Sequence, residues 1–84
     1  MNIVIYSKPN CSWCVKAKEL MNKLHLKYDE KILDVDFTKE QLRELKNMSD
    51  WERLFLPQIF VNGKCLGGYE DFVEYCDSHG ITGE

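Results

Sequence analysis

Residues 3–14 read IVIYSKPNCSWC, and this stretch decides the fold. Its first four residues are apolar, β-branched or aromatic, which predicts a short buried strand. Residues 7–10 are rich in turn formers and predict a loop. From Cys11 to about Leu26 apolar residues recur at helical spacing without a glycine or proline, which predicts a helix. Residues 28–35 read less cleanly as a second strand, so the chain opens with a βαβ unit that has two cysteines at its first joint.

Two stretches in the middle of the chain, 38–41 and 49–52, carry the S/T-x-x-E/Q spacing of a capping box. A capping box satisfies backbone donors that the start of a helix leaves open. The first is reinforced by Phe37 and Leu42, which have the spacing of a hydrophobic staple, and Leu42 and Leu45 continue a stripe that should be buried. We therefore expect a helix that starts at the first pattern and ends close to the second, which allows one further helical turn.

The last third of the chain predicts a hairpin followed by a helix. Residues 58–61 and 64–66 flank Asn62-Gly63, which suits a type I′ turn because both central residues need a positive φ. Apolar residues then form one face of a helix that begins at Tyr69, and Gly80 is placed to stop it. The element order is β-α-β-α-β-β-α. This order predicts an α/β fold with a right-handed parallel βαβ unit and a four-stranded mixed sheet flanked by helices on both faces.

Length and composition restrict the class of protein. The chain has 84 residues, of which 44% are hydrophobic and 30% charged, the balance of one small soluble domain. No apolar run approaches the ~18 residues of a transmembrane helix, and no secretory signal precedes the first strand, so we expect a cytoplasmic protein. The formal net charge of −3 argues against a nucleic-acid binder, although residues 8–27 are basic, with five lysines and one acid.

Cys11 and Cys14 carry the candidate chemistry. Their three-residue spacing on a helix brings the side chains close enough for a disulfide. Cys11 lies at the helix start, where open N–H groups and the helix dipole stabilise a thiolate, the reactive form of cysteine. Cys14, one turn further, should face the core and resolve the bond that Cys11 forms. In a cytosolic βαβ setting this pair predicts a thioredoxin-like redox site.

The other cysteines and the histidines leave alternatives open. A zinc site at the cysteine pair would need His25 and His79 as ligands, but each reads rather as a solvated helix residue because neither has the usual spacing to the cysteines. Cys76 reads as a small core residue. Cys65, near a Gly-Gly turn, stays open to oxidation or glutathionylation.

Three motifs taken together resemble those of the glutaredoxins, small proteins of the thioredoxin fold. They are KPNCSWC at 8–14, LPQIF at 56–60 and GGYED at 67–71. The resemblance covers nearly the whole chain and implies a single glutaredoxin-like domain over residues 1–84. It also implies a cis peptide bond before Pro57, facing the reactive cysteine, whereas the general statistics of proline favour a trans bond.

The resemblance implies a glutathione-dependent thiol–disulfide oxidoreductase that reduces protein disulfides or glutathione mixed disulfides through Cys11 and Cys14. Glutathione would be the co-substrate, with no tightly bound cofactor. The partners would be disulfide-containing or glutathionylated proteins, ribonucleotide reductase among them, and the molecule is expected to be a monomer that binds neither nucleic acid nor membranes. The residues that would bind glutathione are Lys8, Trp13, Leu56, Pro57, Gly68, Tyr69, Glu70 and Asp71.

The resemblance implies a partner for each part of glutathione, which is a tripeptide. The backbone of Leu56 would pair with it like an added strand. The residues from Gly68 to Asp71 would hold its γ-glutamyl end through helix N–H groups and the Asp71 carboxylate. Lys8 would meet its glycine carboxylate.

Two departures from the family pattern define further alternatives. Ser12 stands where the commonest motif has proline, and some glutaredoxins with serine there resemble cluster carriers, so a [2Fe–2S] centre held by Cys11 between two protomers is one alternative. Phe55 stands where the family usually has threonine. This leaves room for a thioredoxin-like electron donor that is fed by a flavoprotein reductase.

Overall fold

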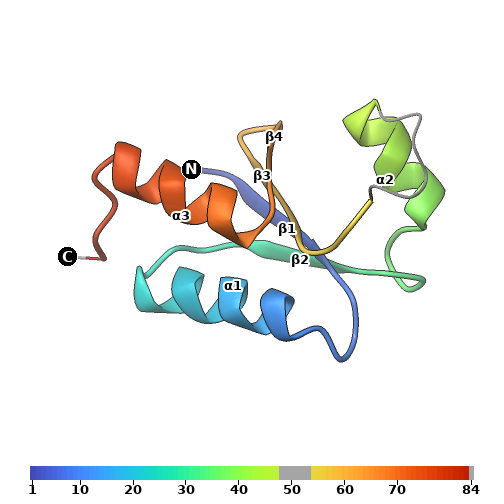
Figure 1. Ribbon diagram of the computed structural model, residues 1–84, viewed down its shortest axis with the longest axis horizontal. Helices are drawn as coiled ribbons and strands as arrows, with labels where there is room; N and C mark the ends of the chain where they lie inside the picture. Colours follow the sequence, from blue (N-terminus) through green and yellow to red (C-terminus); the bar gives the residue numbers. More distant parts are fainter. Residues whose placement is uncertain (48–53, 84) are drawn as a thin grey trace.

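The computed structural model describes residues 1–47 and 54–83. The strands form one mixed sheet in the order β2-β1-β3-β4, with the helices α1, α2 and α3 packed around it (Figure 1). β1 pairs in parallel with β2 and antiparallel with β3, and β3 pairs antiparallel with β4. The predicted fold class and element order are confirmed. The elements are β1 Ile3–Ser7, α1 Ser12–Lys23, β2 Asp29–Ile32, α2 Lys39–Lys46, β3 Gln58–Val61, β4 Lys64–Gly67 and α3 Tyr69–Ser78.

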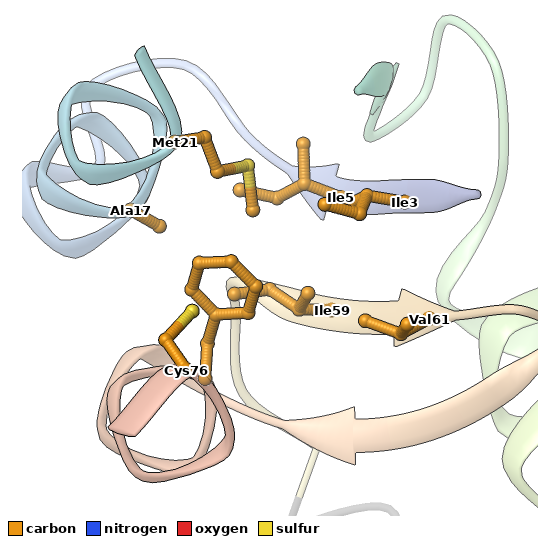
Figure 2. Close-up of a cluster of buried hydrophobic side chains, with 8 residues drawn as sticks. Ile3, Ile5, Ala17, Met21, Ile59, Val61 and Cys76 are labelled. Atoms are coloured by element: carbon orange, nitrogen blue, oxygen red, sulfur yellow. The ribbon is translucent and has the colours of Figure 1, made fainter. Parts of the chain in front are cut away.

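Two hydrophobic clusters lie on opposite faces of the sheet. The smaller one joins Phe37 and Leu42 to Phe60 of β3. Because successive side chains of a strand point to opposite faces, Phe60 and its neighbours Ile59 and Val61 serve different clusters. The larger cluster joins α1 and α3 to the central strands β1 and β3 (Figure 2), and its buried members are Ile3, Ile5, Ala17, Met21, Ile59, Val61, Phe72 and Cys76.

Cys76 is confirmed as a core residue. Its side chain is 3% exposed and lies in the larger cluster, where Figure 2 shows it extending from α3 into the cluster on the side of Ala17. Burial, assisted by the neighbouring charge of Asp77, raises the pKa of the Cys76 thiol. A buried thiol that holds its proton is a poor nucleophile, which agrees with a packing role for Cys76.

The local signals for the second helix and the hairpin are also confirmed. The Thr38 hydroxyl accepts the Gln41 N–H at 3.2 Å, and the Gln41 side chain accepts the Thr38 N–H at 2.9 Å, which completes the capping box of α2. Asn62 has φ 52° and Gly63 has φ 84°, as a type I′ turn requires. Gly80, with φ 65°, follows the end of α3.

Two elements are shorter than predicted. α1 ends at Lys23 instead of near Leu26, and His25 lies beyond it as an exposed residue with φ 57°, so it is solvated but not helical. β2 ends at Ile32, where the Asp36 carboxylate accepts the Ile32 N–H at 2.9 Å and folds the chain into a turn. Asp34 has φ 64° in this turn, which ends the strand before residue 35.

Leu45 was predicted to be buried, and this prediction is wrong. Its side chain is 55% exposed, whereas Leu42 is 1% exposed. The first turn of α2 meets the sheet through Leu42, and Leu54 and Leu56 pack against the same cluster in place of Leu45. The second capping pattern, at 49–52, lies outside the described residues. Over the ranges that the structure describes, no helix combines the length and apolar character needed to cross a membrane.

Candidate active site

Cys11 and Cys14 lie at the joint between β1 and α1, as predicted. Cys11 is the N-cap residue of α1, in extended conformation, and the N–H of Cys14 donates to its Sγ at 3.2 Å. The two sulfurs are joined in a disulfide, and the Cα atoms are 5.2 Å apart. Cys11 retains 8% exposure and Cys14 only 1%. Cys11 is therefore the sulfur that a substrate can reach, and the helix N–H groups around it favour its thiolate form.

The bend at Leu56 and Pro57 faces the reactive sulfur. The Leu56–Pro57 peptide bond is cis, and the Leu56 carbonyl oxygen lies 3.9 Å from Cys11 Sγ. Tyr6 near the end of β1 pairs with Gln58 at the start of β3, so the segment after β1 and the segment before β3 lie at the same end of these two strands. The cis bond implied by the family resemblance is confirmed.

A groove of about 310 Å³ lies beside this contact. Apart from Lys8, it is lined by all of the residues that the resemblance assigns to glutathione. Its wall also includes Phe55, which the sequence marked only as a departure from the family pattern. The lining residues are Trp13, Phe55, Leu56, Pro57, Gly68, Tyr69, Glu70 and Asp71.

Two glycines shape the far wall of the groove. Gly67 has φ 119°, and a Cβ at this position would collide with the Asp71 carboxylate. Asp71 Oδ2 accepts the N–H of Gly68 at 2.9 Å, which fixes the carboxylate at the start of α3. A Cβ on Gly68 would lie 3.0 Å from the ring of Phe55. The glycines therefore allow β4 to turn directly into α3 and bring Asp71 to the rim.

Aromatic rings close the other side of the groove. The rings of Trp13 and Tyr69 are 5.7 Å apart between centroids, with their planes tilted by 47°. The ammonium group of Lys16 stands 4.7 Å from the centroid of the Trp13 ring. Trp13 is nevertheless 49% exposed, so its ring also forms part of the molecular surface beside the cysteines.

Lys8 does not line this groove. It is exposed and lines two neighbouring cavities, a larger one shared with Cys11 and Cys14 and a small one shared with Phe55 and Leu56. The structure thus places Lys8 near both the nucleophile and the bend, but apart from the other residues predicted to bind glutathione.

A polar network that the sequence did not reveal borders the larger cavity. Glu30 of β2 accepts hydrogen bonds from Lys18 Nζ at 2.8 Å and from the Ser7 hydroxyl at 2.7 Å. The hydrogen bonds from Lys18 and Ser7 hold the pKa of Glu30 below its ordinary value of 4.5. The network joins β1, α1 and β2, and its three residues line the same cavity as the two cysteines.

Replacing Glu30 with glutamine is expected to lower the free energy of unfolding at pH 7 by roughly 1 kcal/mol, since a charge-assisted contact is lost. Because the pKa is lowered in the folded state, the stabilisation is present above pH 4.5 and is lost as the pH falls through the folded-state value. Urea unfolding at pH 7 and pH 3 should show the difference from wild type shrinking at pH 3. Glu74→Gln, at an exposed position of α3, is the matched control, and an equal difference at both pH values would contradict the prediction.

The zinc alternative finds no ligand set among residues 1–47 and 54–83. No three His, Cys, Asp or Glu side chains of these ranges gather where they could hold a metal ion. His25 lies in the turn after α1, and His79 is the C-cap of α3, with its ring stacked on Tyr75 at 4.0 Å between centroids.

Comparison with known proteins identifies the family to which the chain belongs. The family model for glutaredoxin matches residues 3–66. Glutaredoxin-C8 of Oryza sativa is 36% identical over 78 residues, which is 92% of this chain and 57% of that protein. The hybrid peroxiredoxin hyPrx5 of Haemophilus influenzae is 36% identical over 74 residues, 88% of this chain and 29% of that protein. The chain therefore spans a little more than half of the first relative and less than a third of the second.

The solved structures agree with the curated relatives. Reduced Escherichia coli glutaredoxin superposes with a TM-score of 0.75 at 31% identity, covering 93% of this chain and 95% of that one. The matched family region contains both cysteines and the Leu56–Pro57 bend, and it spans the sheet from β1 into β4. The chain belongs to the glutaredoxin family.

Proposed function

We propose that this domain is a glutathione-dependent thiol–disulfide oxidoreductase that reduces protein disulfides and glutathione mixed disulfides. The observation that carries the proposal is the approach of the Leu56 carbonyl oxygen to within 3.9 Å of Cys11 Sγ, at the edge of the groove. A cysteine-containing peptide that pairs with the Leu56 backbone has its own sulfur directed to Cys11. The proposed nucleophile and the backbone proposed to bind the peptide are therefore adjacent.

Glutathione fits the chemistry of the groove in three parts. Its cysteine backbone pairs with Leu56 in the manner of an added strand. Its γ-glutamyl carboxylate accepts N–H groups at the start of α3, and its amino group donates to the Asp71 carboxylate. We assign its glycine carboxylate to Lys8, because Lys8 and Leu56 line one small cavity. A volume of about 310 Å³ lies at the lower end for small-molecule sites.

The proposed reaction transfers two electrons in thiol–disulfide exchanges. The Cys11 thiolate attacks the glutathione sulfur of a mixed disulfide, a new Cys11–glutathione bond forms, and the released protein thiolate takes up a proton. A second glutathione thiolate then attacks this bond and leaves as glutathione disulfide, which regenerates the Cys11 thiolate. With a protein disulfide, the Cys11 thiolate attacks one sulfur and forms a Cys11–protein mixed disulfide, which releases the other protein thiolate. Cys14 then attacks Cys11 Sγ and releases the reduced protein. Two glutathione molecules reduce the resulting Cys11–Cys14 bond and leave as glutathione disulfide.

Turnover with two reductants tests this function. The wild-type protein is expected to reduce a glutathionylated peptide when glutathione and glutathione reductase supply electrons, and to turn over far more slowly with thioredoxin reductase. NADPH consumption measures both rates side by side. Preference for thioredoxin reductase would favour the thioredoxin-like electron donor instead.

A matched pair of variants tests whether the groove binds the ligand. Asp71→Asn removes the negative charge at the rim and should raise the KM for the glutathionylated peptide about tenfold, since a charge-assisted hydrogen bond is weakened. Asp77→Asn makes the same change near the other end of α3 and should leave the KM unaltered. Equal effects of the two changes would contradict binding at the groove.

Two further experiments test the alternative cofactor and the choice of substrates. A visible absorbance spectrum of freshly prepared protein distinguishes the redox enzyme from the [2Fe–2S] carrier, because only the carrier is coloured. The Cys14→Ser variant should retain its protein substrates as mixed disulfides at Cys11. We propose that these substrates are disulfide-containing or glutathionylated proteins, with ribonucleotide reductase among them. Identification of the captured proteins tests this proposal.

A further inference from the structure

Gln58 is a fully buried polar residue beside the site. It is the first residue of β3, follows cis-Pro57 directly, and has 0% exposure. The remaining residues of β3, Ile59 to Val61, are apolar and buried. Burying an amide is unfavourable unless its donors and acceptor find hydrogen-bond partners. The partners of the Gln58 side chain therefore indicate why a polar residue occupies this position.

The Gln58 amide connects three separate segments. Its Oε1 accepts Lys46 Nζ from α2 at 2.6 Å and the Cys65 thiol from β4 at 3.6 Å. Its Nε2 donates to the backbone carbonyl of Phe55 at 2.8 Å. An ammonium group can only donate and a carbonyl can only accept, so these contacts fix the orientation of the amide.

The bond to Phe55 spans the bend at Pro57. The carbonyl that Gln58 holds lies three residues earlier, on the other side of the cis peptide bond. Phe55 and Leu56 both line the groove, and the Leu56 carbonyl oxygen is the group 3.9 Å from Cys11 Sγ. The position of the Phe55 carbonyl thus determines where the backbone of Leu56 stands relative to the nucleophile.

Lys46 secures this arrangement from outside the sheet. It is the last residue of α2, which lies beside the segment leading into β3 (Figure 1). Besides its hydrogen bond to Gln58, its Nζ stands 5.9 Å from the centroid of the Phe55 ring. The ring itself is 58% exposed, so its packing alone holds it weakly, and a cation over an aromatic face adds a modest attraction.

We propose that Gln58, oriented by Lys46, is a positioning residue that sets the Phe55–Leu56 backbone for pairing with the cysteinyl part of glutathione; this rests on the proposed function. Gln58 touches neither the ligand nor the reacting sulfur. It acts through the Phe55 carbonyl, so its loss weakens the recognition of a ligand that pairs with Leu56 and spares the intrinsic reactivity of Cys11.

Two substitutions at Gln58 test the inference. Gln58→Glu keeps the size of the side chain and the acceptor for Lys46 but loses the donor to Phe55, and Gln58→Met loses both. Both should raise the KM for a glutathionylated peptide about fivefold, the effect of one hydrogen bond. The reaction of reduced protein with an aromatic disulfide reagent, without glutathione, should keep its rate within about twofold, because this reaction needs no pairing with Leu56.

Gln41→Met is the matched control. Gln41 is the other glutamine of the chain and does not line the groove, and its change removes the side-chain acceptor for the Thr38 N–H, one of the two hydrogen bonds of the α2 capping box. It should lower the melting temperature without altering the KM, which separates lost stability from lost positioning. Lys46→Met, which leaves the Gln58–Phe55 bond in place, should raise the KM about twofold to threefold and provides a second variant if the Gln58 changes prevent folding.

An unchanged KM in both Gln58→Glu and Lys46→Met would overturn the proposal. It would also be overturned if the reagent reaction slowed as much as the glutathione-dependent turnover, because Gln58 would then support the fold of the whole site. Failure of the proposed function looks different, since wild-type protein would then show no glutathione-dependent turnover at all.

Discussion

Replacing Cys11 with serine is expected to reduce the turnover of glutathione mixed disulfides to below about a thousandth of the wild-type rate, since the nucleophile is lost. The serine hydroxyl keeps its proton at neutral pH and forms no disulfide. Cys14 does not substitute for it, because its sulfur is 1% exposed. Glutathione-coupled NADPH consumption with a glutathionylated peptide measures the loss.

Cys14→Ser is the matched control for this experiment. It makes the same atomic change one helical turn away and should retain turnover of glutathione mixed disulfides, because a second glutathione can resolve the Cys11 bond. Reduction of protein disulfides that depends on Cys14 should fall. Complete loss of mixed-disulfide turnover in Cys14→Ser, or substantial turnover in Cys11→Ser, would contradict the assigned division of roles.

The second large effect concerns stability and compares two leucines of one helix. Leu42→Ala should lower the free energy of unfolding by about 3 kcal/mol, because it leaves a cavity between α2 and the sheet. For a domain of this size that corresponds to a melting temperature lower by roughly 15 °C. Leu45→Ala should change the free energy by no more than about 0.5 kcal/mol, since its side chain is 55% exposed.

Thermal and urea unfolding, followed by far-ultraviolet circular dichroism, measure both leucine variants under identical conditions. The pair has a built-in control, because the chemical change and the helix are the same and only the burial differs. Similar losses in the two variants would show that Leu45 is buried in solution, as the apolar periodicity alone predicts.

Local signals in the sequence predicted most of the fold. The capping box at Thr38, the Asn62-Gly63 turn and the helical stripe after Tyr69 each act over a few residues and need no tertiary partner to operate. The errors arose where packing between distant segments decides. Leu45 continues an apolar stripe, but Leu54 and Leu56 pack against the small cluster in its place. The turn that Asp36 closes cut the second strand short.

The candidate site also has a part that local sequence signals predict and a part that depends on contacts between distant segments. The spacing of Cys11 and Cys14 and their place at a helix start follow from the sequence, because both belong to one continuous element. The cis bond before Pro57 followed only from the family resemblance, since general statistics favour trans. The partners of Gln58 and Glu30 come from segments far apart in the chain. A polar residue in an otherwise apolar strand was the one local sign of the Gln58 contacts.

The strand order β2-β1-β3-β4 divides the site between the middle and the edge of the sheet. Cys11 follows β1 and the Leu56–Pro57 bend precedes β3, and each of these strands has a neighbour on both sides. The wall from Gly68 to Asp71 instead follows β4, an edge strand. Because an edge strand has a ladder partner on one side only, we expect β4 to open locally at a lower free energy than β1 or β3. A ligand held by this wall would then leave through an opening at β4, while the central strands keep the surroundings of Cys11 in place. Hydrogen exchange of the β4 and β1 amides measures this difference in local stability.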